Sequence, residues 1–267
     1  MSVRSPRFLL PLIVLCAVTA ACSKTNTSAP ADMATGAGST SSEAAVSDAG
    51  VAYEVVTVER PESVEAYHKA YRATYDICAA TRATLKMPPP APMKVPPADF
   101  ISQRTTYTSD GKAYLVKEEH FLYQTKMEEP TLTCETYLEK TSSTQLIRDG
   151  KVYDAAVDES GKRSSEPPAE WSLPRESKHK LYTESRLVKG YAVKCMPMLP
   201  NTEQLITELC IADLKPGTLT GPTGEPIVLA SRVTSAQKMM GAVLTEPVSV
   251  KVGGRIDKGV FDAAAAP

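Results

Sequence analysis

The chain has almost no excess charge of either sign. It carries 30 basic and 31 acidic side chains, and loss of residues 1–21, which include Arg4 and Arg7, would leave 28 basic against 31 acidic. Proteins that bind nucleic acid gather lysine and arginine on one face or in one run. The sequence contains no such run, so nucleic acid is excluded as an expected partner.

Motifs of catalysis and metal binding are also missing. The three histidines, His68, His120 and His179, do not fall in a His-Glu-x-x-His spacing. No Gly-x-Ser-x-Gly elbow is present, and residues 217–224 lack the Gly-Lys-Ser/Thr of a phosphate loop. Glu118 and His120 share one side of an expected strand, where a solvated face is favoured over a catalytic dyad. The sequence therefore predicts no enzyme, no cofactor and no metal.

Long hydrophobic runs are equally scarce. A transmembrane helix needs about 20 apolar residues, whereas the mostly apolar stretch of residues 8–18 is shorter and contains Pro11. This stretch follows Arg4 and Arg7 and precedes the small residues 19–21. A short apolar run between a positive start and small residues is typical of a secretory signal peptide. We therefore expect residues 1–21 to be removed as a signal peptide.

The end of this stretch, Val-Thr-Ala-Ala-Cys at residues 18–22, resembles the lipobox of bacterial lipoproteins. In that family the cysteine becomes the first mature residue and carries a diacylglyceryl thioether and an N-linked acyl chain such as palmitate. The family prefers leucine three residues before the cysteine, and here that place holds Thr19. The resemblance implies lipidation of Cys22. The alternative is ordinary secretion, with Cys22 left as a free thiol.

Lipidation would fix the location of the protein. Each buried methylene contributes about 0.8 kcal/mol, and two or more acyl chains anchor stably. In proteobacterial lipoproteins an aspartate directly after the cysteine retains the protein in the inner membrane, whereas here Ser23 follows Cys22. The resemblance therefore implies an anchor in the outer membrane and a domain that faces the periplasm.

Residues 23–50 contain no aromatic residue, and Val46 is their only branched aliphatic residue. Such a segment cannot bury enough apolar surface to offset the entropy cost of ordering its backbone. We expect residues 22–50 to form a lipidated cysteine followed by a disordered tether. Residues 51–267 then form a single domain.

One helix and many strands are expected in this domain. In residues 61–85, the side chains of Val64, Tyr67, Tyr71, Tyr75 and Cys78 recur with helical spacing, and Pro61 suits a first turn. The proline-rich residues 87–97 end this helix and form a stiff extended connector. The expected strands are 101–108, 112–124, 131–139, 145–148, 152–157, 178–188, 191–196, 204–213, 227–233 and 247–252.

Glycine-based turns at residues 109–111, 149–150 and 189–190 join several of these strands as hairpins. The predicted fold class is α+β, mostly β: a curled antiparallel sheet or incomplete barrel with an N-terminal helix packed on it. Residues 179–195, 208–215 and 241–264 resemble the end of the open-barrel superfamily of the Lol-type lipoprotein carrier and its receptor. That resemblance implies an incomplete barrel, a helical lid and an apolar cavity between them.

Six cysteines are present. Cys16 leaves with the signal peptide and Cys22 is the lipidation site, so Cys78, Cys134, Cys195 and Cys210 remain. An even number of cysteines in an oxidising compartment predicts disulfides. We favour the pairs Cys195–Cys210 and Cys78–Cys134 among the three possible pairings. A zinc site is the alternative, but the sequence lacks a Cys-x-x-Cys pair.

Two functions are compatible with these features. The first is a membrane-anchored periplasmic lipoprotein that binds a lipid or another hydrophobic ligand, with Tyr67, Tyr71 and Tyr75 lining the cavity. The second is a structural or protein-interaction lipoprotein of the cell envelope without a ligand. In that case the tyrosines are a helix face that packs on the sheet. A hydrolase is a third class, and no motif supports it.

Overall fold

The computed structural model describes residues 51–127, 132–171, 181–197, 206–214, 219–222, 224–234 and 241–266. These residues belong to one compact unit, Ser47–Pro267. The predicted signal peptide, Cys22 and the predicted tether lie outside the described residues.

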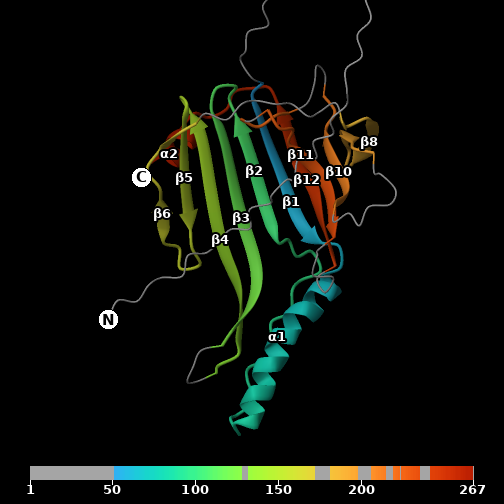
Figure 1. Cartoon of the computed structure of the whole chain (residues 1–267), viewed down its shortest axis with the longest axis vertical. Helices are drawn as coiled ribbons and strands as arrows, with labels where there is room; N and C mark the ends of the chain where they lie inside the picture. Colours follow the sequence, from blue (N-terminus) through green and yellow to red (C-terminus); the bar gives the residue numbers. More distant parts are fainter. Residues whose placement is uncertain are drawn as a thin grey trace, which may run out of the picture. The chain divides into compact units, whose positions relative to one another are not determined.

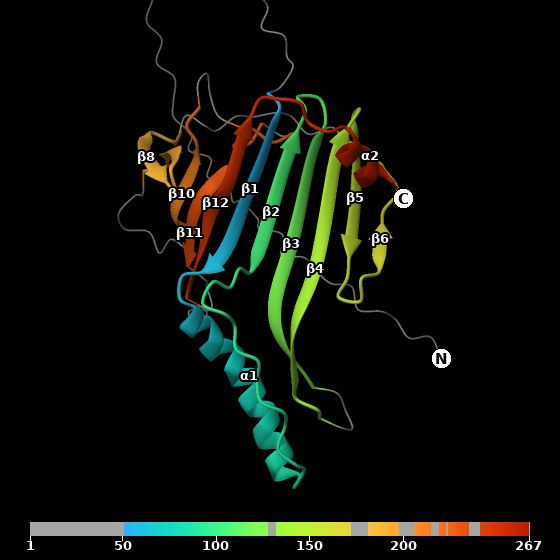
Figure 2. The same cartoon turned by 180° about the vertical axis from the view of Figure 1, so that it is seen from behind.

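The described chain forms one open antiparallel sheet of 12 strands together with two helices (Figures 1 and 2). The strand order is β6-β5-β4-β3-β2-β1-β12-β11-β10-β9-β8, and β7 pairs with β5. The predicted fold class is therefore confirmed. The strands are β1 (Tyr53–Pro61), β2 (Gln103–Ser109), β3 (Tyr114–Lys126), β4 (Glu135–Arg148), β5 (Lys151–Val157), β6 (Arg163–Ser165), β7 (Ala169–Glu170), β8 (Glu184–Val188), β9 (Tyr191–Cys195), β10 (Ile206–Ala212), β11 (Val228–Thr234) and β12 (Ala242–Val252).

Several strands differ from the sequence prediction, which contains neither β6 nor β7 and which begins β12 at residue 247 instead of Ala242. The expected set lacks β1, which pairs with β2 on one side and β12 on the other and so lies in the middle of the sheet. The expected strands 131–139 and 145–148 are a single strand, β4. Residues 140–144 look polar, but β4 continues through them because its backbone pairs with β3, and from Ser142 onward also with β5.

The three predicted hairpin turns are present. The carboxylate of Asp110 accepts hydrogen bonds from the amides of Lys112 and Ala113, which closes the turn between β2 and β3. Asp149-Gly150 and Lys189-Gly190 join β4 to β5 and β8 to β9, and all four residues have positive φ. Two successive residues of positive φ form the type I′ turn, whose twist matches that of paired strands.

Helix α1 (Val64–Thr84) begins later than predicted. Pro61 is the last residue of β1 and pairs with Val243, so it does not occupy the first turn of the helix. The N-cap is Ser63, whose hydroxyl accepts a hydrogen bond from the amide of Ala66. The buried residues of α1 are Tyr67, Tyr71 and Cys78, which belong to the predicted apolar face.

The proline-rich connector runs back beside α1. The hydroxyl of Tyr75 donates to the carbonyl of Ala91, and the guanidinium of Arg82 donates to the carbonyl of Pro88. The amide of Lys94 then donates to the hydroxyl of Thr136 on β4. The connector is thereby fixed to both the helix and the sheet.

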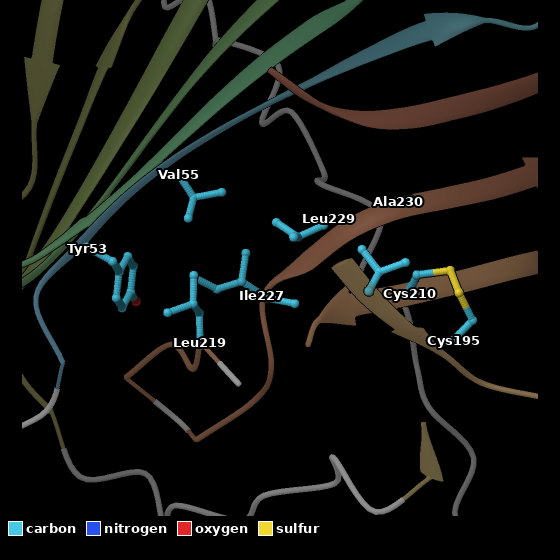
Figure 3. Packing of buried hydrophobic residues seen from close by; sticks show 10 residues of the cluster. Tyr53, Val55, Cys195, Cys210, Leu219, Ile227, Leu229 and Ala230 are labelled. Atoms are coloured by element: carbon cyan, nitrogen blue, oxygen red, sulfur yellow. A yellow bond between two sulfur atoms is a disulfide. The ribbon is translucent and has the colours of Figure 1, made fainter. Parts of the chain in front are cut away.

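The sheet has two faces with different cores. We call the face that carries Tyr53 and Val55 the inner face; the face that carries Leu115 and Leu146 is the outer face. On the inner face, β9 to β11 and the residues around Leu219 pack against β1 (Figure 3). This core consists of Tyr53, Val55, Val193, Cys195, Cys210, Ala212, Leu219, Ile227, Leu229 and Ala230.

Both helices contact the outer face. Helix α2 (Gly259–Ala265) buries Phe261 against Leu115 and Leu146. Helix α1 packs on Tyr123, which alternates in phase with Leu115 along β3. The helical lid implied by the resemblance would cover the inner face, so the observed position of α1 differs from that arrangement.

Candidate functional site

The inner face becomes more polar along the strands. Cross-strand neighbours form four rows on this face, named here after their β1 member: the Tyr53, Val55, Thr57 and Glu59 rows. The first two rows are largely apolar, and the last two are polar. From β1 to β4 the rows are Tyr53, Ser109, Tyr114 and Ile147; Val55, Tyr107, Val116 and Gln145; Thr57, Thr105, Glu118 and Ser143; and Glu59, Gln103, His120 and Thr141.

Glu118 is the centre of the polar rows. Its carboxylate accepts hydrogen bonds from Ser143 Oγ at 3.3 Å and from Gln103 Nε2 at 3.5 Å. His120 Nε2 lies 3.7 Å from Glu118 Oε2, and the two side chains are 43 % and 39 % exposed. This pair is the solvated arrangement favoured from the sequence. Because Ser143 donates to the carboxylate, its proton is not directed at a histidine as in a serine nucleophile.

Glu59 of β1 lies on the same face as Glu118 and His120, with β2 between them. Burial raises the pKa of the Glu59 carboxyl, and the negative charge of Glu118 raises it further, while His120 and Thr245 act in the opposite direction. Burial also raises the pKa of Tyr107, in the next row, to about 12, with both carboxylates adding to the effect. Two half-buried carboxylates are therefore close enough to repel each other.

In the described chain these two carboxylates face the titratable His120 but no permanent cation. No lysine or arginine of the described chain forms an ion pair with Glu59 or Glu118. Elsewhere in the sheet, carboxylates pair with cations across or along strands. Such pairs are Arg60–Glu246, Lys251–Glu54, Arg232–Glu62, Lys117–Glu119 and Lys194–Asp213.

Charge is segregated between the two faces of β1 to β5. Among the described residues, Lys126 is the only lysine or arginine that alternates onto the inner face of these strands. The acidic residues on that face are Glu59, Glu118, Glu135, Glu139 and Asp154. The outer face carries Arg60, Arg104, Lys117, Lys140, Arg148 and Lys151, with Glu54 and Glu119.

A hollow of about 470 Å³ lies at the β4 end of the acidic residues. The hydroxyl of Tyr137 is 3.4 Å from the carboxylate of Glu159, which follows β5. The hollow is lined by Lys126, Glu135, Tyr137, Leu138, Glu139, Lys140, Glu159 and Ser160. Its charged lining suits a polar group.

A second hollow, of about 440 Å³, lies between α2 and the edge strands β5 and β6. Its lining combines Tyr153, Pro167 and Pro168 with Arg163 and Glu166. Neither of these two hollows, which are formed by described residues, has the continuous apolar lining expected of a lipid cavity.

The three predicted ligand-binding tyrosines belong to α1, and their side chains contact neighbouring parts of the protein. The Tyr67 ring is 4.9 Å from that of Phe100, and its hydroxyl accepts a hydrogen bond from the Tyr123 amide. The Tyr71 ring is 5.5 Å from that of Tyr123, and Tyr75 contacts the connector. This geometry matches the packing alternative, because Tyr67 and Tyr71 join the helix to the sheet and Tyr75 joins it to the connector.

The four remaining cysteines form the two predicted disulfides, Cys78–Cys134 and Cys195–Cys210. The first joins α1 to the start of β4, and the second joins directly opposed residues of β9 and β10. The zinc alternative is wrong for these cysteines, because all four sulfurs are in disulfide bonds.

The sequence prediction identified Glu118 and His120 as neighbours but missed Glu59, Gln103 and Glu139. The alternation in Tyr-Glu-Val-Val-Thr-Val-Glu, residues 53–59, was a usable signal for β1 and would have placed Thr57 and Glu59 on one face.

Comparison with protein-family models, curated proteins and solved structures finds no match to this chain. Within the described residues, no helix has the length and apolar character required to cross a membrane.

Proposed function

We propose that this protein is a lipid-anchored component of the cell envelope, located in the outer membrane, that acts by binding a partner and not by catalysis. The observation that supports this proposal best is the division of the inner face. Its apolar rows are filled by side chains of the same chain, including Leu219, Ile227 and Leu229. In its polar rows Glu118 and His120 remain about two fifths exposed, and within the described chain neither Glu59 nor Glu118 pairs with a lysine or arginine.

This division favours the protein-interaction alternative over a hydrophobic ligand. A lipid or acyl chain needs a cavity with a predominantly apolar lining. The apolar surface of Tyr53 and Val55 is occupied, because both side chains are at least 97 % buried against the protein itself. The polar rows would offer an acyl chain no favourable surface, since carboxylates lose hydration when apolar groups cover them.

The anchor is tested by the substitution Cys22→Ser, expressed in a Gram-negative host. We expect the unchanged chain to sediment with the outer membrane and the variant to appear in the soluble periplasmic fraction. Cys16→Ser is the matched control, because it alters a residue of the predicted signal peptide that is not lipidated. Retention of the Cys22→Ser variant in the membrane would show that the anchor assignment is wrong.

The hydrophobic-ligand alternative is tested by native mass spectrometry of protein released gently from membranes. We expect one mass shift from the acyl chains of Cys22 and no further bound lipid. A stoichiometric second lipid that persists in the Cys22→Ser variant would instead support the lipid-binding hypothesis.

A further inference from the structure

In the described part of the chain, the polar half of the inner face is accessible on β3 and β4, whereas Thr57 on β1 and Thr105 on β2 are at least 96 % buried. The two helices contact the outer face, and the segment around Leu219 packs on the Tyr53 and Val55 rows. The Thr57 and Glu59 rows retain exposed side chains, since Glu118 and His120 are each about two fifths exposed. This part of the sheet is accessible to a partner.

The acidic residues of this face are dispersed, which limits what can neutralise them. Glu59 lies on β1 and Asp154 on β5, four strand spacings or about 19 Å apart across the sheet, and Glu135 lies about 33 Å along β4 from Gln145, the neighbour of Asp154. The described residues contain no group of three histidine, cysteine, aspartate or glutamate side chains that could hold a metal ion. A single small cation would therefore reach only part of this surface.

We propose that the acidic inner face, defined by Glu59, Glu118, Glu135, Glu139 and Asp154, docks an extended, lysine- and arginine-rich segment of a partner polypeptide. The proposal rests on the binding role proposed above and adds the surface and the chemistry of the partner. An extended segment of about six residues spans the roughly 19 Å across the sheet from Glu59 to Asp154, and one of about ten residues spans the roughly 33 Å along β4 to Glu135. Its cationic side chains would supply the lysine or arginine partners that Glu59 and Glu118 lack within the described residues.

The uncharged side chains of the face distinguish a polypeptide from other polycations. Gln103, Gln124 and Gln145 each donate one hydrogen bond to a neighbouring carboxylate. The amide oxygen of each can still accept a hydrogen bond, and the second N–H of Gln124 and of Gln145 can donate one. Peptide groups need both, whereas the methylenes between the nitrogens of a polyamine need neither. The hollow beside Tyr137 has room for one long cationic side chain, which would contact an aromatic ring and Glu139.

The test measures binding of fluorescein-labelled octalysine to the mature chain, residues 22–267 with Cys22→Ser, by fluorescence anisotropy at low and physiological salt. We expect binding that weakens with salt, because exposed charges are screened. The variant Glu59→Gln/Glu118→Gln should bind at least tenfold more weakly. Glutamine matches glutamate in size, and a second pair, Glu139→Gln/Asp154→Asn, repeats the test if the first pair fails to fold.

The matched control is Glu54→Gln/Glu119→Gln, which removes the same charge from the outer face of the same two strands. It should retain affinity within about twofold. The proposal is overturned if octalysine does not bind, or if both double variants lose the same affinity for octalysine. It is also overturned if octaglutamate binds with comparable affinity. Displacement of octalysine by spermine at equal charge concentration would also overturn it, in favour of a small polycation. Release of Cys22→Ser from membranes is measured separately, so failure of the anchor and failure of the docking surface are distinguishable.

Discussion

Removal of the Cys78–Cys134 disulfide should loosen α1 more than the sheet. The perturbation is the double substitution Cys78→Ala/Cys134→Ala, chosen because both positions are almost fully buried and a serine would leave an unpaired hydroxyl there. Beyond Cys78, α1 buries no residue, so its last turns depend on the bridge and on hydrogen bonds from Arg82 and Tyr75. An isolated helical segment of this length is marginal in water.

The magnitude follows from loop closure. When α1 opens locally, the intact bridge still ties Cys78 to the sheet and closes the segment from Pro61, a loop of about 17 residues. Closure of such a loop raises the free energy of local opening by about 3 kcal/mol. Loss of the disulfide should therefore lower amide protection in α1 about a hundredfold. For global unfolding the bridge spans 56 residues, and its loss should cost about 4 kcal/mol.

Hydrogen exchange followed by mass spectrometry distinguishes these two effects. Peptides from α1 should lose protection in Cys78→Ala/Cys134→Ala in conditions where peptides from β1 and β3 remain protected. The control Cys195→Ala/Cys210→Ala lies within the sheet and should leave the relative protection of α1 unchanged. Equal loss of protection in α1 and β3 after removal of Cys78–Cys134 would refute the reasoning, because α1 would then open only when the whole domain unfolds.

Two further perturbations test the sheet itself. Glu59→Gln should raise the melting temperature at pH 7 and not at pH 3. The pKa of Glu59 is raised in the folded state, so ionisation of its carboxyl lowers the stability of the fold as the pH rises. At pH 3 the carboxyl is protonated in both the folded and the unfolded state, and this cost is absent. A melting temperature that responds equally at both pH values would contradict this account. Phe261→Ala should cost about 3 kcal/mol in urea denaturation, because a buried phenyl ring is lost between α2 and the outer face. The adjacent, 40 % exposed Val260, changed to alanine, is the control and should cost less than 1 kcal/mol.

The parts of the fold that depend on neighbouring residues could be predicted from the sequence. Hairpin turns at Asp110, Asp149 and Lys189 are local, and the helical face of Tyr67, Tyr71 and Cys78 repeats within a few turns. The disulfide pairs were predictable because four cysteines allow few pairings. These features need no knowledge of which distant strands meet.

The strand order and the candidate site depend on distant pairing. Strand β1 pairs with β12, so Tyr53 lies opposite Val252 although almost 200 residues separate them. Nothing near Glu118 in the sequence indicates Glu59 as its neighbour, because β2 must pair with both strands in the correct register. A shift of one residue would move Glu59 to the outer face. The site could therefore be predicted only as the pair Glu118 and His120.

The charged side chains of the polar rows also account for why the inner face stays accessible at Glu118 and His120. If the chain covered Glu118 and His120 as it covers Thr57 and Thr105, Glu59 and Glu118 would lose their remaining hydration without gaining a cation, which is costly for two neighbouring carboxylates. The Tyr53 and Val55 rows carry no such charge, and there the chain does pack on itself around Leu219. A domain that served only as a scaffold would gain stability from apolar residues in all four rows. The two mutually repelling carboxylates Glu59 and Glu118 lower the stability of the fold, and an external cationic partner would offset that cost. The accessible part of the inner face is therefore also the proposed docking surface.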